Sequence, residues 1–64
     1  MNEKDFYWLK KCIANRDVYV ITVDNDGAFV TDLNSFETVH DFEHYGWRLA
    51  LDLFLAFGCN AEEA

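Results

Sequence analysis

The sequence predicts a small α+β domain in the order helix, β-hairpin, helix, and three observations lead to this prediction. The 64 residues are 52% hydrophobic and 17% aromatic, which is typical of a chain that folds around a core. An apolar pattern with helical spacing at the start gives way to β-branched residues at 18–23. A glycine-containing turn then leads into a second apolar run. This length allows one domain, over residues 1–64.

The first helix is expected over residues 3–14. Asn2 is a good N-cap residue, and Asp5 follows at the third helical position, as in a weak capping box. Five apolar residues recur at helical spacing and are expected to form the buried face of this helix: Phe6, Trp8, Leu9, Cys12 and Ile13.

Residues 18–23 and 28–33 are expected to pair as a β-hairpin. We place Gly27 at a positive φ, in a type I turn with a bulge whose loop is residues 25–27. Because two strands alone are not stable, helices and a further strand are expected to support the hairpin. The register that follows places three pairs on one face: Val23 with Phe29, Ile21 with Thr31, and Tyr19 with Leu33.

Two alternatives remain open for the segment after the hairpin. Asn34 followed by Glu37 forms a second capping box, which favours a long helix, bent or broken at Gly46, and the order αββα. In the alternative interpretation, alternating side chains make residues 36–40 a third strand, and the order becomes αβββα.

The run from Trp47 to Phe57 is apolar on nearly all sides and is expected to be helical, with Gly58 ending the helix. A helix of this kind is normally buried, and a domain of this size cannot easily surround it. Residues 59–64 are expected to be a frayed tail. We therefore expect a second apolar interface, in a homodimer or on a target protein, with these candidate residues: Trp47, Leu51, Phe54 and Leu55.

The two cysteines, Cys12 and Cys59, lie among apolar residues and are expected to be reduced and buried. The chain begins without a basic segment followed by an apolar one, and it has no apolar stretch long enough for a membrane span. These features predict a cytoplasmic protein that does not associate with membranes.

The charge is strongly acidic and unevenly distributed. Residues 1–16 carry four bases and two acids, whereas residues 17–64 carry one base and ten acids, and the net charge is −7. Such a surface repels nucleic acid and anionic lipid and attracts a basic protein. A simpler interpretation is that the charge keeps a hydrophobic protein soluble. The candidate acidic binding surface consists of Asp24, Asp26, Asp32, Glu37, Asp41 and Glu43.

No motif predicts catalysis, a cofactor or a metal site. Residues 40–44 fit the H-x-x-E-H pattern of inverted zinc proteases, but a third ligand and a substrate cleft are missing, so His40 and His44 are expected on a solvated helix face. Asp24 and Asp26 fit part of a calcium loop, but carboxylates are missing at both ends of that loop.

In size, acidity and lack of catalytic motifs, the chain resembles the small anti-defence proteins of phages, including anti-CRISPR and anti-restriction inhibitors. The resemblance implies a non-enzymatic inhibitor that binds a nucleic-acid-processing enzyme, with carboxylates in the places of phosphates. The alternative is a homo-oligomeric scaffold module that interacts through its apolar helix and whose acidity serves solubility.

Overall fold

The computed structural model describes residues 2–42 and 48–64 and shows an α+β domain, as predicted. Helix α1 (Glu3–Ala14) is followed by strands β1 (Tyr19–Val23), β2 (Ala28–Asp32) and β3 (Thr38–Phe42). Helix α2 (Arg48–Ala56) and strand β4 (Ala61–Glu63) complete the order αβββαβ.

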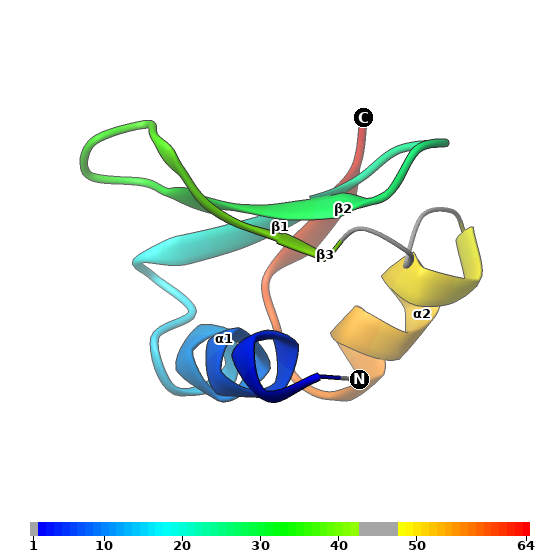
Figure 1. The fold of residues 1–64 in the computed structure, drawn as a ribbon, viewed down its shortest axis with the longest axis horizontal. Helices are drawn as coiled ribbons and strands as arrows, with labels where there is room; N and C mark the ends of the chain where they lie inside the picture. The colour runs from blue at the N-terminus through cyan, green and yellow to red at the C-terminus, as the bar shows by residue number, and fades with distance from the viewer. Residues whose placement is uncertain (1, 43–47) are drawn as a thin grey trace.

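The strands form one sheet in the order β3-β2-β1-β4, in which β4 runs parallel to β1 and the other pairs are antiparallel. Both helices lie on the same face of this sheet, and no helix of residues 2–42 and 48–64 covers the opposite face (Figure 1). α1 packs against β1 and β3, and α2 packs against β4 and β1. The core therefore lies between one sheet face and two helices.

The segment after the hairpin forms a third strand, so the predicted long helix from Asn34 is wrong and the αβββα alternative is closer. The strand covers Thr38–Phe42, two residues beyond the predicted range 36–40. The expected capping box does not form, because the N–H of Asn34 donates to Asp32 Oδ1 at 2.8 Å and belongs to a loop. Pairing with β2 gives the hairpin the third strand that an isolated hairpin lacks.

The β1–β2 register differs from the predicted one by one residue. Val23 pairs with Ala28 and Ile21 with Val30, so Val30 lies on the helix-facing side in place of Thr31. The cause is the turn: Asp24 Oδ1 accepts hydrogen bonds from the N–H groups of Asp26 and Gly27, each at 2.9 Å. Gly27 is not at a positive φ, so the predicted bulge turn is wrong.

The C-terminal residues form β4 and are not the frayed tail that the sequence predicted. The N–H of Ile21 donates to the carbonyl of Asn60, and the N–H of Ala64 donates to the carbonyl of Val23, each at 2.9 Å. These bonds satisfy backbone groups along the free edge of β1, which local sequence patterns do not reveal.

α1 has the predicted bounds and the predicted cap, since Asn2 Oδ1 accepts the N–H of Asp5 at 2.8 Å. Its buried face is narrower than expected: Leu9 and Cys12 are buried with Asp5, whereas Phe6 and Ile13 are 53% and 39% exposed. A polar residue therefore occupies the side of the helix that faces the sheet.

Gly58 stops α2 as its C′ residue, as predicted. Gly58 has a φ of +95°, which favours glycine. Its N–H donates to the carbonyl of Leu55 and the N–H of Cys59 to the carbonyl of Phe54, each at 3.0 Å, the two bonds of a Schellman motif. This stop turns the chain back toward the sheet, where β4 begins.

Candidate functional site

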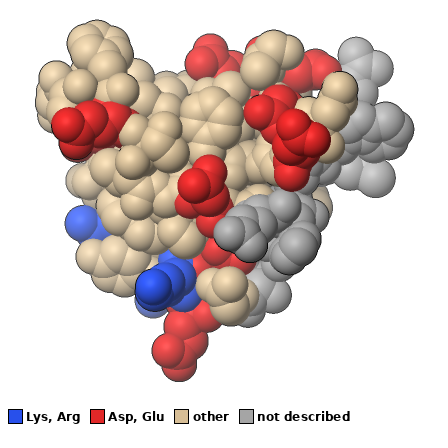
Figure 2. All heavy atoms as spheres, turned by 45° about the horizontal axis from the view of Figure 1, so that its top comes forward, with Lys and Arg blue, Asp and Glu red and all other residues tan. Residues whose placement is uncertain are grey.

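Acidic side chains gather at one end of the sheet, at the β1–β2 turn. The register places Asp41 beside Phe29 of β2, and Glu62 and Glu63 beside the last two residues of β1. Figure 2 shows acidic side chains crowded at the upper right of the view, with Lys and Arg toward its lower left. We call the following residues the acidic end: Asp24, Asp26, Asp41, Glu62 and Glu63.

Three carboxylates of the acidic end line an open hollow of about 200 Å³, with Phe29 in its wall. Asp24 holds the turn through its two backbone hydrogen bonds, so its carboxylate has a structural task. Asp26 and Asp41 are exposed and line the same hollow. The hollow therefore combines one carboxylate that fixes the turn with two that face the solvent.

The acidic end carries charge that no basic side chain compensates. Within residues 2–42 and 48–64, the ion pair found is that of Asp5 with His40, so no acid of the acidic end is paired with Lys or Arg. Several bases lie in the other layer, on α1 or in the loop after it: Lys4, Lys10, Lys11 and Arg16. The molecule thus has a basic helix in one layer and an anionic sheet end in the other.

The predicted acidic surface is divided between two ends of the sheet. Asp24, Asp26 and Asp41 meet at the acidic end, whereas Asp32 and Glu37 lie in or next to the β2–β3 loop at the other end. Glu43 lies outside the described residues. Sequence reasoning missed Glu62 and Glu63, because it treated them as part of a frayed tail.

The predicted apolar interface is also divided. Phe54 is 3% exposed and belongs to the core of the chain itself, and Leu51 packs against that core. Leu55 is half exposed, together with Leu53 and Phe57, which the sequence analysis did not select. The fourth candidate, Trp47, lies outside the described residues. Two sides of α2 therefore have different environments, and Phe54 is not accessible to a second molecule.

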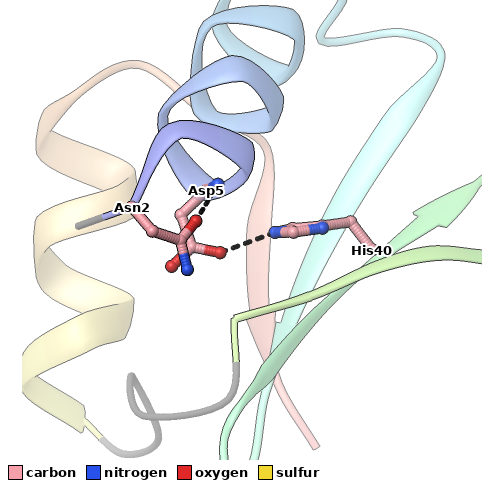
Figure 3. A network of polar contacts seen from close by, with 3 residues as sticks. All are labelled: Asn2, Asp5 and His40. Atoms are coloured by element: carbon pink, nitrogen blue, oxygen red, sulfur yellow. Dashed lines mark hydrogen bonds and ion pairs between the residues drawn. The ribbon is translucent and has the colours of Figure 1, made fainter.

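A buried acid and a histidine join α1 to β3, a contact that the sequence analysis did not find. His40 Nε2 and Asp5 Oδ1 are 2.7 Å apart, with side-chain exposures of 12% and 7%. Figure 3 shows the His40 ring reaching from β3 to the first turn of α1, where Asn2 caps the N–H of Asp5. The pair therefore fixes the start of α1 against the sheet.

Aromatic rings surround His40. Its ring stacks on Trp8 at a centroid distance of 6.0 Å and an interplanar angle of 16°. Phe42 meets it edge-on at 4.8 Å and 90°. His40 lies on a strand, so the prediction that it belongs to a solvated helix face is wrong. His44 lies outside the described residues.

Both cysteines are buried free thiols, as expected. Burial, with a smaller contribution from the neighbouring Cys59 thiol, raises the pKa of Cys12 to about 12. Burial also raises the pKa of Cys59, while Arg16 acts in the opposite direction. These thiols therefore stay protonated and unreactive at neutral pH.

The raised thiol pKa values predict a loss of stability in alkali. The unfolded thiols ionise near their ordinary value of 9.0, whereas the folded Cys12 stays protonated up to about 12. The free energy of unfolding is therefore expected to fall as the pH rises above 9.0, by up to about 1.4 kcal/mol per pH unit for each thiol. Urea unfolding between neutral and alkaline pH measures this slope. Cys12→Ala is the control: an unchanged slope in this variant would contradict the assignment to Cys12.

The chain was compared with models of protein families, with curated proteins and with solved structures, and no match was found in any of the three. In the described part of the chain, no helix is long and apolar enough to cross a bilayer. Residues 2–42 and 48–64 also contain no group of three or more potential metal ligands close enough to share an ion. The function is therefore argued from the geometry of the surface.

Proposed function

We propose that this protein is a non-enzymatic inhibitor that binds a nucleic-acid-processing enzyme, with the acidic end in the groove that otherwise holds phosphates. The observation that supports it best is the convergence of three carboxylates on one hollow, with no Lys or Arg among the described residues that line it. Unpaired carboxylates on a small body attract a basic groove over long distances and accelerate association. The anti-defence character expected from the sequence belongs to this proposal.

The separation of charge between the helix layer and the sheet favours one orientation of the molecule as it approaches a partner. Bases on α1 repel a basic groove, whereas the acidic end attracts one, so the molecule is oriented before contact. The stretch of sheet that would enter the groove includes exposed Asp41 and half-buried Phe29, which pair across β2 and β3. Carboxylates would replace phosphates, and Phe29 would supply apolar contact.

The test uses the pair Asp26→Lys/Asp41→Lys, because these two carboxylates line the hollow and Asp24 is needed for the turn. The tagged wild-type chain is first used to capture proteins from a bacterial lysate, and the captured protein is identified by mass spectrometry and purified. The variant is expected to bind it at least about 100-fold more weakly at low salt. Raising the ionic strength toward 1 M, where the Debye length is about 3 Å, is expected to release the wild-type chain.

The matched control is Asp17→Lys/Asp52→Lys, which changes the net charge by the same amount at exposed positions on the helix side. This control is expected to keep most of the affinity. Equal losses in the two variants would show that only net charge matters and would overturn the proposal. Capture of a protein without nucleic-acid-processing activity, or binding that high salt leaves intact, would also overturn it.

The second candidate is the homo-oligomeric scaffold module. The observation that favours it is the exposure of Leu53, Leu55 and Phe57, each at least half exposed on or next to α2. Light scattering on the purified chain separates the two functions: a salt-resistant oligomer that captures no other protein supports the scaffold, and a monomer removes it.

A further inference from the structure

The β2–β3 loop presents an aromatic side chain to the solvent in an unfavourable backbone conformation. Phe36 is 80% exposed and has a φ of +60°, and it is the one residue other than glycine with a positive φ in the described part of the chain. This conformation costs an ordinary L-residue about 1–2 kcal/mol. An exposed ring gains little from burial, so folding does not explain phenylalanine here, and Asn or Gly would fit the backbone better.

Hydrogen bonds hold this loop in a defined shape. The N–H of Phe36 donates to the carbonyl of Asp32 at 2.7 Å, and the N–H of Asp32 donates to the carbonyl of Glu37 at 2.9 Å. Asp32 Oδ1 also accepts the N–H of Asn34 at 2.8 Å, and the N–H of Glu37 donates to Ser35 Oγ at 3.4 Å. The backbone that carries the Phe36 ring is therefore ordered before any partner binds, which lowers the entropic cost of binding.

The surroundings of Phe36 indicate the chemistry of a partner. Asp32 lies at the start of this loop and Glu37 directly after Phe36, and neither is paired with a basic side chain within residues 2–42 and 48–64. The loop lies at the left end of the sheet in Figure 1, opposite the β1–β2 turn. A partner that accepts this loop must offer an apolar pocket for the ring and positive charge around it.

We propose that Phe36 is an anchor residue that inserts into an apolar pocket rimmed by Lys or Arg on the partner protein. The proposal rests on the proposed function, because the basic partner is the one that the acidic end binds. It adds a second contact at the other end of the sheet, with a different energetic origin. The acidic end supplies attraction over long distances, and the Phe36 ring supplies desolvated contact area, which dominates at interface hot spots.

The test is Phe36→Asn, because Asn is among the residues that best tolerate a positive φ. The variant is expected to unfold at the same urea concentration as the wild type or a higher one, since the loop geometry is kept and the strain is relieved. Its affinity for the purified partner captured by the wild-type chain is expected to fall by at least about 30-fold, a typical hot-spot loss. Phe36→Gly, which also accepts a positive φ, provides a second variant with the same expectation.

The control is Leu53→Gln, which removes an exposed apolar side chain (55% exposed) from α2. It is expected to change the affinity by about twofold or less. A clear loss of stability in both Phe36 variants would show that the ring is structural and would overturn the anchor. Equal loss of affinity in Leu53→Gln would also overturn it, because any exposed apolar group would then have the same effect.

The charge variant separates this proposal from the proposed function. If Asp26→Lys/Asp41→Lys loses binding and Phe36→Asn keeps it, the anchor is overturned and the proposed function stands. If Phe36→Asn alone loses binding, the anchor stands and the carboxylate mimicry is overturned. If both variants bind as the wild type does, or if the partner captured is a second copy of this acidic chain, both proposals are overturned.

Discussion

Replacing His40 with phenylalanine is expected to lower the free energy of unfolding by about 1–3 kcal/mol, the usual cost of leaving a buried polar group without its hydrogen-bond partner. The Asp5 carboxylate, 5% exposed, would keep its burial and lose the partner that lies 2.7 Å away. A 64-residue domain has a total stability of about 3–10 kcal/mol. The variant is therefore expected to lose a substantial share of its stability, which circular dichroism and urea titration measure.

The double variant Asp5→Leu/His40→Phe is the control for this prediction. Two apolar residues of suitable volume leave no buried polar group without a partner, so the double variant is expected to be more stable than His40→Phe alone. Thr38→Ala, at an exposed position of the same strand, is expected to change the stability by about 0.5 kcal/mol or less. A double variant that is less stable than either single variant, with additive losses, would contradict a direct interaction between Asp5 and His40.

Features decided by neighbouring residues could be predicted from the sequence. The bounds of α1 followed from the Asn2 cap and the apolar spacing, and the end of α2 followed from Gly58. These signals act within one or two helical turns, so no knowledge of the rest of the fold is needed.

Features decided by pairing between distant segments could not be predicted in the same way. β3 competes with a helical capping box at Asn34, and the outcome depends on the free edge of β2, which the local pattern does not contain. The one-residue shift of the hairpin follows from the Asp24 side chain, which selects a tighter turn than the predicted bulge. β4 forms only because α2 returns the chain to the edge of β1.

In the candidate site, too, local features could be predicted from the sequence and features set by distant pairing could not. The excess of acids was readable from composition, but which acids meet depends on the sheet register, which brings Asp41 to the hollow with Asp24 and Asp26. The Asp5–His40 pair joins residues 35 positions apart. The sequence contained one indication of this pair: Asp5 lies at helical spacing from Leu9 and Cys12, on the apolar side of α1.

Replacing Phe54 with alanine is expected to lower the free energy of unfolding by about 3–5 kcal/mol, as for other buried aromatic residues. The Phe54 ring is 3% exposed and lies 5.2 Å from the Phe42 ring, between α2 and the sheet. Its loss would open a cavity beside Phe42, which also packs edge-on against His40. The variant therefore weakens the contact of α2 with β3 and, through Phe42, the contact of α1 with β3. Thermal unfolding measures the loss of stability.

The matched control is Leu55→Ala, one residue further along the same helix and half exposed, with an expected cost of about 1 kcal/mol or less. The dependence on protein concentration then distinguishes core from interface. If the ring lies inside the monomer core, its removal lowers the free energy of unfolding of each chain equally at every concentration. If the ring lies in a dimer interface, the loss of stability changes with protein concentration by mass action. A Phe54→Ala loss that disappears in dilute solution, together with a large Leu55→Ala loss, would contradict the placement of Phe54 in the core and would restore the apolar helix as a dimer interface.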